Sequence, residues 1–162
     1  MKNVVHSADV PAIEQGNGKG FQLSRRRLGA AAGGEKLGCS LIELAPGKAG
    51  FPAHAHFANE EAVFVLEGEG VLRCGTEDQV LRAGDYAALK VGLPAHRIDN
   101  RGPAPLRYLA ISTMIEPEVV VYPDSNKVAA MAGSPPGGDP SKRPVFDLYL
   151  RSGQVGYWEG EE

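Results

Sequence analysis

Short apolar runs, each ended by glycine or proline, constrain the fold of this chain more than any other feature of its sequence. The 162 residues include 21 glycines and 12 prolines, which divide the apolar segments along most of the chain. The runs recur at intervals of about ten residues, which is the spacing of strands in an all-β sandwich or barrel. We therefore predict an all-β domain with one hydrophobic core, which this chain length allows.

Most of the apolar runs have the length of ordinary β-strands. The expected strands cover residues 21–28, 37–44, 62–66, 71–74, 79–82, 86–89, a strand through His96 and Ile98, 106–115 and 119–122. The run 62–66 is apolar throughout, which predicts a buried strand. Residues 126–132 are the segment that favours a helix, of about one or two turns.

The chain is expected to divide into three parts. Residues 1–36 would form an N-terminal arm and first strand, residues 37–122 the barrel, and residues 123–162 a linker and C-terminal segment. The linker is the glycine- and proline-rich stretch 133–140, which cannot continue a sheet. The segment 145–158 is rich in apolar and aromatic residues, so we expect it to pack on the barrel or on a partner subunit.

Charge and apolar content exclude several classes of protein. The net charge of −3 provides no basic surface, so we expect no nucleic-acid partner. The N-terminal stretch lacks the apolar centre of a signal peptide, and no apolar run approaches the ~20 residues of a membrane span, which predicts a cytoplasmic protein without a membrane partner. Cys39 and Cys74 lie in apolar strand-like runs and are expected to be buried free thiols.

Three of the four histidines lie in two short segments, which indicates a metal site. His54 and His56 are two residues apart, so on extended backbone both imidazoles face the same side. Glu61 begins the apolar run 62–66, where a carboxylate is costly to bury unless it is paired or metal-bound. With His96 from a later strand, these groups suit Zn, Mn, Fe, Ni, Co or Cu. The alternative is that they are unrelated polar residues on loops.

The spacing of these residues resembles the two sequence motifs of the cupin family. The first motif is matched by His54, His56, Glu61 and Gly68, with one, four and six residues between them. The second is matched by Gly84, Asp85, His96 and Asn100. The resemblance covers about residues 37–115 and implies a jelly-roll barrel, also called a double-stranded β-helix.

The resemblance also implies that three histidines and one glutamate bind a metal inside the barrel. On this basis the ligands would be His54, His56, Glu61 and His96. The family's spacing to the glycine of the first motif favours Glu61 over its neighbour Glu60, which is the alternative ligand.

Two positions depart from the family pattern. Lys48 occupies a position where the family usually has glycine, and three residues instead of two separate Gly92 from His96. The loop that leads into the His96 strand is therefore one residue longer than in the family pattern. This difference affects the conformation of the loop and the direction of the His96 side chain. Asn100 is expected to close the next turn through its side chain and is not counted as a ligand.

Three further features could contribute to a binding site. Arg25 and Arg27 would share one strand face and bind a phosphate or carboxylate, or else lie on a solvated or subunit-contacting strand. Arg107 and Tyr108 alternate on one strand, so one of them faces the interior. Tyr86 either lines the cavity or packs in the core.

Three functions are compatible with a metal-binding cupin, because this fold hosts many activities. The first is a metal-dependent enzyme acting on a small oxygen-rich anion, most narrowly a sugar-phosphate isomerase with an unassigned glutamate or tyrosine as base. The second is a dioxygenase that uses iron or nickel. The third is a non-catalytic domain that binds or senses a small molecule. No catalytic residue is assigned, and a homodimer is expected because exposed strand edges need cover.

Overall fold

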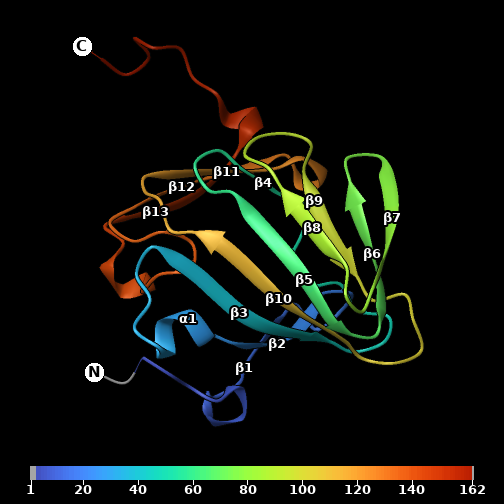
Figure 1. Ribbon diagram of the computed structural model, residues 1–162. Helices are drawn as coiled ribbons and strands as arrows, with labels where there is room; N and C mark the ends of the chain where they lie inside the picture. Colours follow the sequence, from blue (N-terminus) through green and yellow to red (C-terminus); the bar gives the residue numbers. More distant parts are fainter. Residues whose placement is uncertain (1–2, 162) are drawn as a thin grey trace.

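The protein is built from antiparallel β-strands arranged in three sheets, as Figure 1 shows. This computed structural model describes residues 3–161. Its strands confirm the all-β prediction, and its one α-helix is α1 (Leu28–Ala31). Short 3₁₀ turns lie at Ser7–Asp9, Pro123–Ser125, Pro140–Lys142 and Arg151–Gly153. Within the described residues, no helix combines the length and hydropathy needed to cross a bilayer.

The strand order places distant parts of the sequence side by side. The largest sheet has the order β1 (Ile13–Gly16), β2 (Gln22–Arg26), β3 (Leu37–Leu44), β10 (Leu106–Thr113), β5 (Glu61–Glu67) and β8 (Tyr86–Leu89). The second has the order β13 (Val145–Leu150), β12 (Lys127–Ala132), β11 (Glu118–Tyr122) and β4 (Ala55–His56). The third has the order β7 (Glu77–Arg82), β6 (Glu69–Cys74) and β9 (His96–Asp99).

The sheets do not close into one hydrogen-bonded barrel, which corrects the expectation of a closed β-barrel. Each sheet ends in short strands, such as the two-residue β4, so continuous pairing stops there. An isolated bridge between His54 and His96 joins the second and third sheets. The result is an open jelly-roll arrangement in which this bridge sets two of the predicted ligands beside each other.

The main hydrophobic core is formed by side chains of the largest and third sheets. Its most buried members include Ile42, Leu44 and Leu106, each with 0% of its surface exposed. A smaller cluster on the second sheet contains Val120, Ala129 and Met131. Because one face of each sheet is apolar, the sheets pack against one another and leave their polar edges to solvent.

Strand β5 differs from its prediction. Residues 62–66 were expected to be buried, but Phe64 and Leu66 are exposed while Val63 and Val65 are buried. Side chains alternate between the faces of a strand, and only one face of β5 meets the core. Glu61 shares the inner face with Val63 and Val65, which directs its carboxylate inward.

The helix expected at residues 126–132 is wrong, because this segment forms strand β12. It pairs with β11 on one side and β13 on the other. Ala129 and Met131 point into the smaller core, with two-residue periodicity. Pairing and burial on both sides therefore override the helix propensity of an alanine-containing segment.

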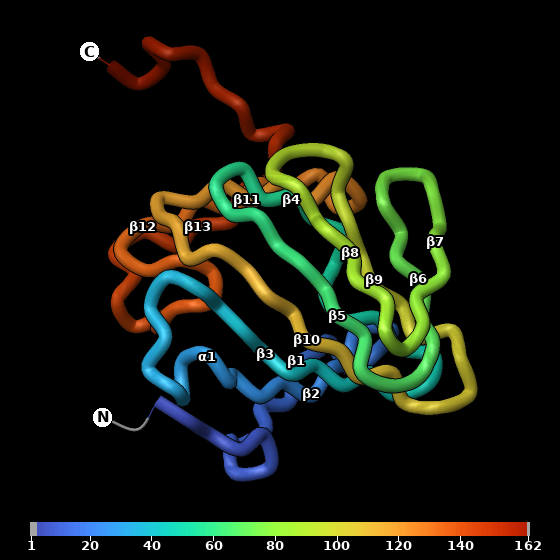
Figure 2. Tube along the Cα trace, viewed as in Figure 1, coloured from blue at the N-terminus to red at the C-terminus, as the bar shows by residue number. Residues whose placement is uncertain are grey.

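The segments outside residues 37–122 join the sheets. Leu23 of β2 is 2% exposed and belongs to the main core. Strand β13 pairs with β12 along its whole length, although all its side chains remain exposed. The chain then leaves the body of the molecule as an extended C-terminal segment, which Figure 2 shows in red.

Two glycines at the β5–β6 turn permit a close approach to β10. Gly68 has a φ of +84°, and a Cβ there would lie 2.4 Å from the Pro105 carbonyl oxygen. Gly70 does not require a positive φ, but a Cβ there would lie 2.5 Å from Leu106. Gly68 thus supplies the backbone conformation of the turn, while the lack of a side chain at Gly70 leaves room for Leu106.

Candidate metal centre

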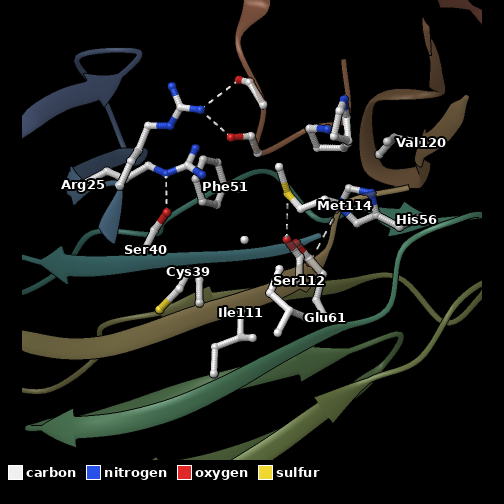
Figure 3. Close-up of a pocket in the computed structure, with 18 of the residues that line it drawn as sticks. Arg25, Cys39, Ser40, Phe51, His56, Glu61, Ile111, Ser112, Met114 and Val120 are labelled. Carbon is white, nitrogen blue, oxygen red and sulfur yellow. Dashed lines mark hydrogen bonds and ion pairs between the residues drawn. The ribbon is translucent and has the colours of Figure 1, made fainter. Parts of the chain in front are cut away.

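A cavity of about 820 Å³ lies between the largest and second sheets and contains the predicted histidine and glutamate side chains. Its walls come from β2, β3, β5 and β10 on one side and from β11 and β12 on the other. The loop that precedes β13 also contributes to the lining. Figure 3 shows His56 and Glu61 directed toward one another in this cavity.

The structure brings the predicted ligands together around the Glu61 carboxylate. The distances to Glu61 Oε2 are 3.8 Å from His54 Nε2, 3.6 Å from His56 Nε2 and 3.0 Å from His96 Nε2. His54, Glu61 and His96 offer donor atoms that all lie within 4.8 Å of one another. Side chains from three separate segments therefore form one cluster that could bind a metal.

Hydrogen bonds orient two of the imidazoles. His54 Nδ1 lies 2.8 Å from the carbonyl oxygen of Pro52, and His56 Nδ1 lies 3.1 Å from Glu118 Oε2. These oxygens only accept hydrogen bonds, so each Nδ1 carries the hydrogen in a neutral ring. In this tautomer each Nε2 is unprotonated and lies on the side of Glu61. A histidine that binds a metal through Nε2 requires the same tautomer.

The pKa shifts of His54 and Glu61 favour the metal-binding forms of these two side chains near neutral pH. Burial is the main reason that the pKa of His54 falls from 6.5 to about 4, so its ring is neutral. Burial alone would raise the pKa of Glu61, but the hydrogen bond with His96 and the charges of the other histidines lower it to about 2. For His56, burial opposes the hydrogen bond to Glu118, and the net pKa is raised.

The geometry of the donor atoms fits a transition metal. Nitrogen and oxygen ligands about 2.1 Å from a metal lie roughly 3.0–3.4 Å from one another in octahedral or tetrahedral coordination. The three nitrogen-to-oxygen distances around Glu61 are 3.0, 3.6 and 3.8 Å, so small side-chain adjustments would suffice. Imidazole with carboxylate is also a donor set that suits these metals.

Glu60 and His6 do not lie in this cluster. Glu60 is exposed, and its backbone N–H donates to Thr113 Oγ1. His6 caps the first 3₁₀ turn by accepting a hydrogen bond from Ala8. The position of Glu61 on the inner face of β5 thus agrees with the motif spacing that favoured it over Glu60.

Glu118 is a part of the site that the sequence interpretation missed. Its side chain has 0% of its surface exposed and accepts hydrogen bonds from His56 and from the backbone N–H groups of Phe57 and Ala58. Asn59 donates to it through both backbone and side chain. Glu118 stands at the start of an apolar strand, as Glu61 does, and that shared pattern was the signal that could have revealed it.

Two tyrosines line the cavity as neutral hydroxyl groups. Tyr108 is 2% exposed, and burial together with the Glu61 charge raises its pKa. Burial also raises the pKa of Tyr122, whose ring stacks on His54 with centroids 6.1 Å apart. Of the alternating pair on β10, Tyr108 therefore faces the interior, whereas Arg107 lies outside near Glu67 at 3.0 Å. Tyr86 is 64% exposed and is not part of the lining.

Other predicted residues have clear positions. Arg25 and Arg27 both line the cavity, so they do not lie on a solvated outer face. Asn100 closes its turn as expected, because its side chain donates to the carbonyl oxygens of Leu44 and Ala104. Cys39 and Cys74 are free thiols that are only partly buried, which corrects the expectation of full burial.

Comparison with known proteins agrees with this fold. The chain matches the family model of the cupin domain over residues 40–112. An uncharacterised protein from Methanocaldococcus jannaschii is 34% identical over 59 residues, and the match spans 36% of this chain and 46% of that relative. The chain thus covers less than half the length of the curated relative that it matches.

Solved structures match much more of the chain. A candidate sugar phosphate isomerase from Acidithiobacillus ferrooxidans aligns over 96% of both chains, with a TM-score of 0.80 and 25% identity. A sugar phosphate isomerase of the cupin superfamily from Silicibacter pomeroyi aligns over 96% of this chain and 98% of its own, with a TM-score of 0.77 and 26% identity. A predicted oxalate decarboxylase from Thermotoga maritima aligns over 69% and 99%, with a TM-score of 0.61 and 26% identity.

With both motifs, the jelly-roll arrangement and these matches, residues 40–112 form a cupin domain.

Proposed function

We propose that this cupin is a metal-dependent enzyme acting on a small oxygen-rich anion, and that it isomerises a sugar phosphate. The observation that carries the proposal is that one cavity contains both the histidine–glutamate cluster and the side chains of Arg25 and Arg27. Such a cavity can hold the oxygen atoms of a substrate at one place and its negative charge at another. The similarity to two structures named as sugar phosphate isomerases supports the choice of reaction.

The metal would be held by His54, His56, Glu61 and His96. The candidates are Zn, Mn, Fe, Ni, Co and Cu, because each accepts imidazole and carboxylate ligands. When bound, such a metal supplies Lewis acidity, which polarises a carbonyl oxygen and stabilises enediolate charge.

The chain itself would position the substrate and move the proton. Tyr108 and Tyr122 are hydroxyl donors at neutral pH because their pKa values are raised. Transfer between adjacent carbons also requires a base. Glu35 is the glutamate of the cavity lining other than Glu61, which makes it the first base to test by the substitution Glu35→Gln.

The first experiment is to measure metal content and turnover with the untagged full-length protein. Elemental analysis should find one metal per chain, and His54→Ala or His56→Ala should lower that occupancy while His6→Ala leaves it unchanged. Full occupancy in the first two variants would mean that the ligand assignment is wrong.

The second experiment is to screen sugar phosphates in deuterated water with and without oxygen. An isomerase should work equally in both conditions and place solvent deuterium on the exchanged carbon. Oxygen uptake coupled to substrate loss would instead identify a dioxygenase. Metal and ligand binding without turnover of any compound would leave a non-catalytic binding domain.

A further inference from the structure

Three arginines of the cavity have no carboxylate partner. Several arginines elsewhere in the protein form ion pairs, as Arg82 does with Glu69 at 3.2 Å. Arg25, Arg27 and Arg143 line the cavity, and among residues 3–161 none of the three takes part in an ion pair. Asp139 also lines the cavity and its charge acts on Arg27 and Arg143, but it lies beyond ion-pair distance of both. Three half-buried guanidinium groups without a paired carboxylate in one cavity indicate a site for an anion.

Two of these arginines are held by the loop that precedes β13. Arg27 donates to the carbonyl oxygens of Gly137 and Gly138, the latter at 2.9 Å. Arg143 donates to three consecutive carbonyl oxygens, those of Ser134, Pro135 and Pro136. Carbonyl oxygens satisfy N–H groups but carry no net charge, so the positive charge of both arginines persists.

Arg25 differs from the other two because it is oriented by a side chain. Its Nε donates to Ser40 Oγ at 3.0 Å, and Ser40 is 4% exposed on the neighbouring strand β3. The Arg25 side chain makes no other hydrogen bond within the described part of the chain, so its terminal nitrogens can serve a ligand. Burial, and then the charge of Arg27, lower the pKa of Arg25.

The arginine end and the metal end belong to one cavity. Figure 3 shows Arg25 with Ser40 on one side of the cavity and Glu61 with His56 on the other. The Glu61 charge acts on Arg25 and raises its pKa, partly offsetting the effect of burial. A small ligand could therefore contact both ends at once.

We propose that Arg25, oriented by Ser40, binds an oxyanion group of the ligand, either phosphate or carboxylate, with Arg27 and Arg143 adding positive charge. The terminal nitrogens of a guanidinium match two oxygens of such a group. This inference rests on the proposed function for the identity of the ligand beyond its oxyanion group. Binding of the oxyanion at Arg25 can be measured even if the protein catalyses no reaction.

The test is calorimetric titration of the full chain with inorganic phosphate and, separately, with acetate. It is done on the protein as isolated and again after chelation, because a metal could itself bind either anion. The wild type should bind one of the two anions saturably in both states. Arg25→Gln should weaken that binding about tenfold or more, since a charged hydrogen-bonded contact is lost.

Three further variants keep the test decisive. Arg82→Gln removes an exposed surface arginine and should leave binding unchanged, which controls for net charge. Ser40→Ala keeps the charge of Arg25 but removes its orienting hydrogen bond, and should weaken binding about threefold. If Arg25→Gln does not fold, Ser40→Ala and Arg25→Lys decide the question, because both retain the positive charge.

The outcomes separate this site from the proposed function. Absence of saturable binding of both anions, or equal affinities in the wild type and in the variants of Arg25 and Ser40, would overturn the oxyanion site. Anion binding that depends on Arg25, in a protein that turns over no sugar phosphate, would support the site and contradict only the isomerase proposal.

Discussion

Replacement of Glu118 by glutamine tests how a buried carboxylate supports the site. One oxygen of Glu118 accepts hydrogen bonds from His56 and Asn59, and the other from the N–H groups of Phe57 and Ala58. All these partners are donors, and an amide offers one oxygen and one NH₂ group. Whichever way the amide turns, its NH₂ group faces donors, so at least two charge-assisted hydrogen bonds are lost.

The size of the expected destabilisation in Glu118→Gln can be calculated in two ways. Loss of two hydrogen bonds to a charged group costs about 3–5 kcal/mol in free energy of unfolding. Independently, burial alone would raise the pKa of Glu118, but the hydrogen bonds from His56 and Asn59 lower it from 4.5 to about 2. A difference of that size is worth about 3 kcal/mol, in agreement with the first value.

The sign of the pH dependence follows from this pKa. Because the folded-state pKa lies below the ordinary value of 4.5, Glu118 stabilises the protein above about pH 4.5 and loses that contribution as the pH falls toward 2. The opposite holds for His56, whose raised pKa favours the folded state below its ordinary pKa of 6.5. In Glu118→Gln the acid-dependent loss should be smaller than in the wild type.

Urea unfolding of metal-free protein at pH 7 and pH 3 measures both effects. Glu77→Gln, on the exposed strand β7, is the matched control and should leave the unfolding free energy within about 0.5 kcal/mol of the wild type. Metal affinity, measured by competition with a chelator, should fall about 10–100-fold in Glu118→Gln because His56 loses its orienting partner. A loss of stability below about 1 kcal/mol at pH 7 would refute the reasoning.

Two other predictions concern the core and the oligomer. Leu106→Ala should lower the unfolding free energy by about 2–5 kcal/mol in denaturant titration, because this side chain is 0% exposed, whereas Val80→Ala, which is 50% exposed, should change it by less than about 1 kcal/mol. We also expect a homodimer, so light scattering at micromolar concentration should give twice the chain mass of 17.2 kDa. Deletion of residues 151–162 should weaken this association without loss of metal, since Tyr157 and Trp158 are 86% and 77% exposed. A full-length monomer at every concentration would contradict the dimer.

Local sequence was sufficient to predict most of the strands between residues 21 and 122 and the two motif segments. Turn residues between apolar runs define strands because their backbone requirements are local, as the positive φ of Gly68 illustrates. The two-residue spacing of His54 and His56 and the position of Glu61 before an apolar run also need no knowledge of distant contacts. Side chains two residues apart share a face of a strand, so Glu61 points inward with Val63 and Val65 once that face of the strand is buried.

The tertiary structure decided everything that depends on distant pairing. Glu118 meets His56 across 62 residues of sequence, and Arg27 meets the loop at Gly137 across 110. Residues 127–132 form a strand because β11 and β13 flank them, and the packing of the sheets decides that Tyr108, and not Arg107, faces the interior. Such contacts depend on which sheet faces which, and an alternating pattern gives the two faces of a strand without saying which partner each face will meet.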